Sequence, residues 1–105
     1  MVLGDDLINI QGFEWDKGNL EHIEKHSVDY RECEEIFLNE PLLLSEDEAH
    51  SKIERRFQAL GVTNERRLIF LAFTIRKNKI RVVSARDQNR KERKELQQGG
   101  GENYE

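Results

Sequence analysis

The chain has 105 residues, of which 36% are charged, and a formal net charge of −4. This length is enough for one small domain with a modest core and excludes a multidomain enzyme. The single cysteine, Cys33, excludes an internal disulfide and a four-cysteine metal site. The longest apolar run, residues 68–73, is too short to span a bilayer, and residues 1–12 lack the basic start of a signal peptide. We therefore expect a soluble, cytoplasmic protein that does not bind membranes.

The two halves of the chain carry opposite charge. Residues 1–51 contain 14 acidic and 3 basic residues, a net charge of −11, whereas residues 52–94 contain 4 acidic and 14 basic residues, a net charge of +10. The basic half is suited to bind a phosphate backbone, and the asymmetry indicates different partners for different parts of the chain. The alternative is that the halves interleave in the fold and their charges pair across the surface.

A first helix is predicted close to the N-terminus. Residues 1–12 form a lead-in without a clear pattern, and residues 13–15 alternate as a short edge strand does. Asp16 is suited to cap a helix over residues 17–26, because its carboxylate can accept from the free backbone N–H groups of the first turn.

A second helix follows at once. Asp29 and Glu32 have the spacing of a capping box, so we expect a helix that runs to about Leu38. Pro41 is then expected to end it, because proline disfavours the helical conformation of the preceding residue. Residues 42–44 are apolar and predict a short strand.

The second half of the chain predicts strands. Residues 56–62, 67–75 and 80–85 have strand patterns, and the turns at 63–66 and 76–79 are short enough for an antiparallel meander. The middle strand is almost continuously apolar, as expected at the centre of a sheet. The predicted fold class is α+β: a three-strand antiparallel meander with short edge strands, two N-terminal helices on one face, and a C-terminal helix.

The last predicted helix covers residues 88–97, with Asp87 as its cap. Leu96 is its only large apolar residue, so the helix is expected to need a docking partner. Glycines at 99–101 end it. Residues 13–97 are therefore expected to form the domain, and residues 98–105 a disordered tail.

A cluster of polar side chains lies on the first predicted helix. Asn19, His22 and His26 are spaced by three and four residues and share one helix face, with Lys25 beside them. Histidine exchanges protons near neutral pH, which suits acid–base catalysis or substrate contact. The alternatives are that one histidine packs against the sheet and caps a loop and, less favoured, that the histidines bind zinc.

Arginines of the basic half gather in three segments, of which the first also has a histidine and the second has hydroxyls. Arginine binds phosphate oxygens through two parallel hydrogen bonds, so each segment is a candidate anion site. For each, the alternative is a solvated surface with local ion pairs. The segments are His50-Ser51 with Glu54, Arg55 and Arg56; Thr74 and Arg76 with Arg81, Ser84 and Arg86; and the helical run Arg90-Lys91-Glu92-Arg93-Lys94.

Taken in order, these segments resemble the BrnT toxin family over roughly residues 13–96. The most specific part is Ile80-Arg-Val-Val-Ser-Ala-Arg86 placed after Thr74-Ile-Arg76. The family has glycine after the Lys-His pair where this chain has Ser27, which adds strain if that position needs a positive φ. The other matching segments are Phe13-Glu-Trp-Asp16, Asn19-Leu-Glu-His-Ile-Glu-Lys-His26, Val28, Glu34-Glu-Ile-Phe37, Pro41, His50-Ser51, Glu54-Arg-Arg-Phe57, Leu60-Gly61 and Arg90-Lys-Glu-Arg93.

The resemblance implies a RelE-like fold and an endoribonuclease of a type II toxin–antitoxin system that needs no metal or cofactor and inhibits translation. Such an enzyme needs a base to take the proton of the attacking RNA 2′-hydroxyl and an acid to protonate the leaving 5′-oxygen. It also needs cations to stabilise the negative charge that develops on the phosphorane. The expected catalytic residues are His26 or His50 for proton transfer with Lys25 in support, Arg56, Arg76 and Arg86 on the scissile phosphate, and Ser84 to orient it. Arg55, Arg81, Arg90 and Arg93 are expected to contact RNA, and Arg90 and Leu96 to contact an antitoxin.

The expected partners are RNA and a BrnA-like antitoxin, with two toxins per antitoxin dimer. Operator DNA would be bound only through the antitoxin. The main alternative is a non-catalytic nucleic-acid- or protein-binding module of a degenerate toxin–antitoxin complex.

Overall fold

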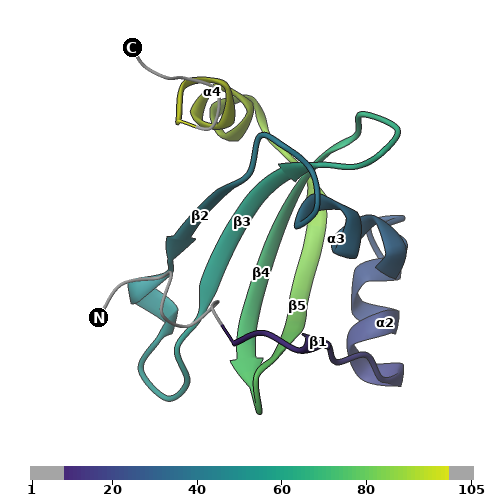
Figure 1. Cartoon of the computed structure of the whole chain (residues 1–105), viewed down its shortest axis with the longest axis vertical. Coiled ribbons are helices and arrows are strands. Elements are labelled where there is room, and N and C mark those ends of the chain that lie inside the picture. Colours follow the sequence, from purple (N-terminus) through teal and green to yellow (C-terminus); the bar gives the residue numbers. More distant parts are fainter. Residues whose placement is uncertain (1–8, 100–105) are drawn as a thin grey trace.

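The computed structural model describes residues 9–99 (Figure 1). It contains the two leading helices, the strand meander and the final helix that the sequence predicts. The predicted tail lies outside the described residues from 100 onward, and residues 1–8 of the lead-in also lie outside them. In chain order the elements are β1 (Gly12–Phe13), α2 (Lys17–Glu24), α3 (Tyr30–Ile36), β2 (Leu43–Glu46), the 3₁₀ turn η1 (Glu48–His50), β3 (Phe57–Val62), β4 (Leu68–Arg76), β5 (Lys79–Asp87) and α4 (Arg90–Gly99).

The described residues form a five-stranded sheet in the order β1-β5-β4-β3-β2. Strands β2 to β5 pair antiparallel, which confirms the predicted meander. The expectation of a wholly antiparallel sheet is wrong, because β1 pairs parallel to β5 through Gly12 with Lys79 and Phe13 with Ile80. A strand of two residues has no alternation from which a pairing direction can be predicted.

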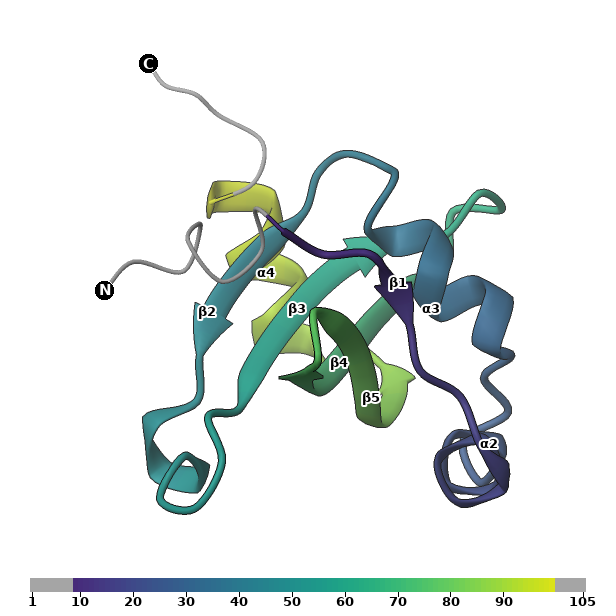
Figure 2. The same cartoon turned by 60° about the horizontal axis from the view of Figure 1, so that its bottom comes forward.

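Helices α2 and α3 cover one face of the sheet (Figure 2). The side chains of this face form the core, with Ile23 of α2 and Ile36 of α3 each at most 1% exposed. Helix α3 approaches β3 closely at Gly61, where a Cβ atom would lie 2.7 Å from the Cβ of Ile36. The buried strand residues of this face are Phe57, Ala59, Ile69, Leu71, Phe73, Ile80, Val82 and Ala85.

Both leading helices begin as the sequence predicts. Asp16 caps α2 and Asp29 caps α3, each in a full capping box. The helices end at Glu24 and Ile36, two residues earlier than predicted, so Pro41 does not set the end of α3.

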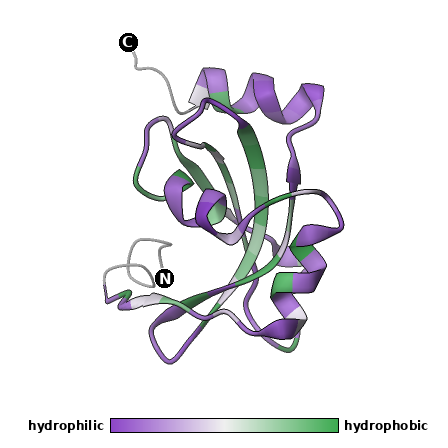
Figure 3. Cartoon of the chain, turned by 90° about the vertical axis from the view of Figure 1, so that its right-hand side faces the viewer, coloured by the Kyte–Doolittle hydropathy of each residue, from purple (hydrophilic) through white to green (hydrophobic). Residues whose placement is uncertain are grey.

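Helix α4 packs on the opposite face of the sheet (Figures 1 and 2). Leu96 is only 3% exposed, so the sheet already covers the one large apolar side chain of this mostly hydrophilic helix (Figure 3). The expected cap, Asp87, is wrong: Asp87 ends β5 and binds Arg67 at 2.7 Å. Asn89 caps α4 instead, because its Oδ1 accepts from the Glu92 backbone N–H at 2.8 Å.

A β-bulge at Val83 interrupts the alternation of β5. Ser84 lies opposite Ala72, whereas Val82 lies opposite Phe73, so Val83 is the extra residue. The bulge brings Arg81, which precedes it, onto the same face as Ser84 and Arg86, which follow it. We call this face, on the side of α4, the open face.

Candidate functional site

A groove lies on the open face between the sheet and α2. Its volume is about 260 Å³. Strand alternation brings Thr74 and Arg76 to it from β4, and Arg81 lies opposite Thr74 on β5. We call it the arginine groove; its lining residues are Gly18, Asn19, His22, Glu54, Arg56, Thr74, Arg76, Arg81, Val82 and Val83.

Two buried donors in the arginine groove have no hydrogen-bond partner within the described part of the chain. They are the Oγ1 hydroxyl of Thr74, a residue only 2% exposed, and the Nε of Arg56. A buried polar group without a partner costs about 1–3 kcal/mol of stability. Such groups are rare in folded proteins and require an explanation. Both atoms belong to residues that line the groove.

The other arginines of the groove are held by carboxylates. Glu54 accepts from Arg76 at 2.8 and 3.0 Å, and Asp16 accepts from Arg81 at 2.9 and 3.3 Å. The hydrogen bond from Arg76 lowers the pKa of Glu54, and the one from Arg81 lowers the pKa of Asp16. Both carboxylates are therefore ionised at neutral pH and balance the positive charge of their partners.

A tight loop places His50 next to Arg56. The Ser51 hydroxyl donates to the Asp47 carbonyl at 2.6 Å and accepts from the Arg56 backbone N–H at 2.9 Å, and the Asp47 N–H donates to the Arg56 carbonyl at 2.8 Å. His50, Glu54 and Arg56 consequently line one hollow of about 410 Å³. Glu54 and Arg56 also line the arginine groove, so the two cavities share this pair.

The imidazole of His50 is bound to a carboxylate. Its Nδ1 lies 2.8 Å from Oδ2 of Asp47, and the Gln58 side-chain amide donates to the same oxygen at 3.3 Å. Burial alone would raise the pKa of Asp47, but the hydrogen bonds from His50 and Gln58, together with the charge of His50, lower it below its ordinary value. Asp47 is therefore ionised and acts only as an acceptor.

Arg86 and Ser84 also lie on the open face, nearer to α4. Arg86 donates to both carboxylate oxygens of Glu92, at 2.8 and 2.9 Å, and its guanidinium lies 4.1 Å from the Phe70 ring centroid. This pairing raises the pKa of Arg86, so the side chain stays charged. Arg86 thus joins α4 to the sheet, while Ser84 is half-buried beside it.

The polar face of α2 divides between structure and site. Asn19 is 5% exposed, and its amide donates to the carbonyls of Glu14 and Val82 at 3.0 and 3.2 Å. The residue of this face that packs is therefore Asn19. His22 and His26 are both exposed, so the alternative that a histidine packs against the sheet is wrong. His22, one turn further on, lines the arginine groove.

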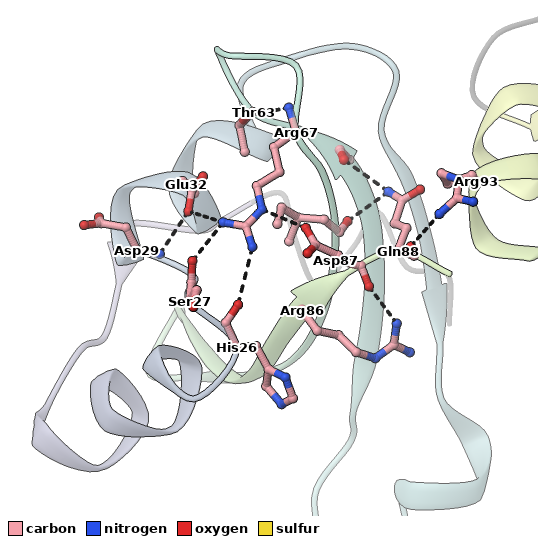
Figure 4. A network of polar contacts seen from close by, with 12 residues as sticks. His26, Ser27, Asp29, Glu32, Thr63, Arg67, Arg86, Asp87, Gln88 and Arg93 are labelled. Carbon is pink, nitrogen blue, oxygen red and sulfur yellow. Dashed lines mark hydrogen bonds and ion pairs between the residues drawn. The ribbon is translucent and has the colours of Figure 1, made fainter. Parts of the chain in front are cut away.

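Lys25 and His26 lie beyond the end of α2 and line neither the arginine groove nor the hollow at His50. Arg67, to which the sequence analysis gave no role, fixes this segment (Figure 4). Ser27 there has a φ of 60°, the positive value considered above. Arg67 donates to the carbonyls of His26 at 3.4 Å and Ser27 at 2.9 Å, and to the carboxylates of Glu32 at 3.0 Å and Asp87 at 2.7 Å.

The remaining predicted contact residues lie outside the groove. Arg55 lines neither the groove nor the hollow at His50. It pairs with Glu46 at 2.8 Å, and its guanidinium lies 5.2 Å from the Phe57 ring centroid. Arg90 is exposed on α4, and Arg93 donates to the Gln88 carbonyl at 2.9 Å. Leu96 of α4 is buried between this helix and the sheet, so it is not exposed to a partner in this conformation.

Ion pairs join the acidic and basic halves of the chain. Arg55 pairs with Glu46, Arg67 with Glu32, and Arg81 with Asp16, at 2.8, 3.0 and 2.9 Å. For these three arginines the halves interleave, which was the alternative to a wholly unpaired basic surface.

Within residues 9–99, no group of three or more histidine, cysteine, aspartate or glutamate side chains could hold a metal ion. No helix there is both long and apolar enough to cross a membrane.

Asp47 and Gln58 are the residues of this site that the sequence analysis missed. Asp47 stands three residues before His50, a spacing that brings side chains together in a helical turn, and this could have revealed it. Gln58 gives no such signal, because its contact with Asp47 depends on how the loop folds onto β3.

Comparison with known proteins agrees with the resemblance found in the sequence. Residues 15–92 match the model of a family described as the ribonuclease toxin BrnT of type II toxin–antitoxin systems. The match defines the class as a ribonuclease toxin that has an antitoxin partner. The chain belongs to the BrnT family. No curated protein matches it.

Proposed function

We propose that this chain is a metal-independent endoribonuclease that cleaves RNA at a phosphodiester bound in the arginine groove and thereby inhibits translation. The observation that supports this best is the pair of unpartnered donors, Thr74 Oγ1 and Arg56 Nε, in a groove lined by three arginines. A phosphate oxygen accepts from such donors, and a developing phosphorane charge strengthens these hydrogen bonds.

The reaction needs one proton acceptor and one proton donor. The RNA 2′-oxygen attacks phosphorus, its proton passes to a base, and the 5′-oxygen leaves with a proton from an acid. The products are a 2′,3′-cyclic phosphate and a 5′-hydroxyl. We assign the base to His50 and the acid to His22, because their cavities meet at Arg56 and Glu54.

The cations hold the phosphate. Arg56 and Arg76 bind the scissile phosphate, and the Thr74 hydroxyl donates to it. Ser84 orients the RNA strand beside this phosphate. Arg86 holds a neighbouring phosphate near α4. Lys25 and His26 take no step here, because they line neither cavity.

Cleavage of end-labelled RNA in the presence of a strong chelator tests this function. Arg56→Ala should reduce turnover about 10²–10³-fold, the usual effect of removing one transition-state donor. Arg31→Ala is the matched control, because Arg31 is exposed on α3. RNA bound without cleavage by the wild-type chain would favour the non-catalytic alternative, and activity that chelation abolishes and zinc or manganese restores would refute metal independence.

We further propose a BrnA-like antitoxin as partner, with two toxins per antitoxin dimer and operator DNA bound only through the antitoxin, in the cytoplasm. Support for a charged docking surface comes from α4, where Arg90, Lys91 and Lys94 are exposed. The antitoxin is expected to contact this helix.

A further inference from the structure

We infer that Asp47 is the positioning residue of the reaction: it holds His50 in the tautomer whose Nε2 accepts the proton of the RNA 2′-hydroxyl. The inference rests on the proposed ribonuclease function. It concerns a residue that would touch neither the RNA nor the scissile bond and would act through His50.

The Asp47–His50 contact differs from an ordinary surface ion pair. The Asp47 side chain is only 12% exposed, and its Oδ2 lies 2.8 Å from Nδ1 of His50. By contrast, Lys17 and Glu21 on α2 are 87% and 62% exposed and lie 4.0 Å apart. An exposed pair of that kind contributes little, whereas a buried acceptor at short distance imposes an orientation.

The carboxylate is itself held in place from both sides. The Gln58 amide of β3 donates to its Oδ2 at 3.3 Å. On the backbone, the Asp47 carbonyl accepts from the Ser51 hydroxyl at 2.6 Å and from the His50 N–H at 3.2 Å. Asp47 therefore has a fixed position relative to Arg56, whose backbone binds the same loop.

The fixed carboxylate determines which ring nitrogen of His50 carries the proton. An ionised carboxylate can only accept, so the neutral imidazole must carry its proton on Nδ1 and leave the lone pair on Nε2. The His50 side chain is 66% exposed, so little else restricts its ring. Without Asp47 the ring would rotate, and both tautomers would be populated.

Two measurements on the full-length chain test the role of Asp47. The first is the tautomer of each neutral histidine ring, read from two-bond ¹H–¹⁵N correlations by NMR, with His22 and His26 as internal references. The second is the separate effect on kcat and KM for RNA cleavage. The variants are Asp47→Asn, which keeps the size of the side chain, and Asp47→Ala. Glu48→Gln is the matched control, because it removes one negative charge from the same turn.

In the wild-type chain His50 should be the Nδ1–H tautomer. Asp47→Asn should move it toward the Nε2–H tautomer and reduce kcat about 10²–10⁴-fold, as loss of an orienting carboxylate does in other enzymes, with KM changed less than about threefold. Glu48→Gln should leave both unchanged. Equal tautomer populations in wild type and Asp47→Asn, or a kcat for both Asp47 variants equal to that of Glu48→Gln, would overturn the inference. Failure of the wild-type chain to cleave RNA would overturn the proposed function as well, whereas wild-type cleavage that survives Asp47→Ala would overturn this inference alone.

Discussion

Thr74 places a hydroxyl where it lowers the stability of the fold. The residue is 2% exposed and its Oγ1 has no hydrogen-bond partner within residues 9–99. Valine has nearly the same shape without the polar atom. Removing an unsatisfied buried group removes its desolvation penalty of about 1–3 kcal/mol.

We therefore expect Thr74→Val to raise the free energy of unfolding by about 1 kcal/mol and to lower RNA turnover. Urea unfolding and RNA cleavage should be measured on the same samples. Thr63→Val is the control, because Thr63 is equally buried but its hydroxyl accepts from the Arg67 N–H at 3.0 Å, so this change should destabilise. A Thr74→Val protein with unchanged turnover would remove this hydroxyl from the site.

Ser27 has a left-handed backbone conformation, with a φ of 60°. This conformation costs a residue with a Cβ about 1–2 kcal/mol. Glycine avoids that cost, but its greater conformational freedom in the unfolded chain offsets part of the resulting gain in stability. Ser27→Gly should therefore raise the free energy of unfolding by about 0.5–1 kcal/mol. Ser27→Ala keeps the Cβ and should give no gain. Equal stability of the two variants in urea unfolding would show that the backbone there is not strained.

At the scale of single residues, the sequence could identify the types of residue in the site but not which side chains contact one another. Arg56, Arg76 and His50 were predicted for the site and do line its two cavities. The sequence analysis expected His26 or His50 to transfer protons. Helix α2 ends at Glu24, and His26, beyond that end, lines neither cavity. Whether His22 or His26 lines the groove depends on the residue at which α2 ends. Sequence patterns locate helix ends only to within a few residues.

Helix α4 is held to the sheet by a hydrophobic contact and an ion pair. Leu96 supplies the contact, and Glu92 accepts from Arg86 at 2.8 and 2.9 Å. The hydrogen bonds from Arg86 lower the pKa of Glu92 below its ordinary value of 4.5. Because the folded-state pKa is depressed, the stabilisation is complete above that ordinary value and is lost as the pH falls through the folded-state pKa.

Glu92→Gln should accordingly destabilise the chain at pH 7, by about 1 kcal/mol, and have little effect in strong acid. Urea unfolding of both proteins at neutral pH and at a pH well below 4.5 measures the difference. Glu95→Gln is the control, because Glu95 lies on the same helix and is exposed. A deficit of the same size at both pH values would mean that charge plays no part in holding α4.

The elements were predicted well where their patterns are long. The meander β3-β4-β5, the cap at Asp16 and the capping box at Asp29 follow from local sequence, whereas the parallel pairing of β1 and the cap of α4 do not. A strict alternation of β5 would also put Arg81 and Arg86 on opposite faces. The bulge at Val83 brings them together, and its position depends on the pairing with β4 rather than on the local pattern. The assignment of the fold as RelE-like stays a prediction.

At the scale of the whole molecule, the exposed bases of α4 should guide the antitoxin. Electrostatic attraction mainly raises the association rate and is screened by salt. Arg90→Glu should therefore slow toxin–antitoxin association and weaken its salt dependence, with dissociation little changed. Surface plasmon resonance across a salt series measures both rates, with Lys17→Glu, on the exposed part of α2, as the control. An association rate that changes neither with salt nor with Arg90→Glu would contradict this role of α4. It would favour nucleic acid as the ligand of the helix. Leu96→Asp is unsuitable here, because Leu96 is buried and its loss would detach the helix.

The carboxylates of Glu54 and Glu92 also affect the selectivity of the open face between different anions. Glu54 and Glu92 are attached to the same chain as Arg76 and Arg86, so each has an effective concentration that a dissolved carboxylate cannot match. A metabolite with one carboxylate therefore gains little by competing for these two arginines. A phosphodiester, in contrast, can use the donors that no carboxylate occupies, on Arg56 and Thr74, while Glu54 keeps its place. Discrimination between RNA and the abundant organic acids of a cell would then arise from the donors that the fold leaves without a partner.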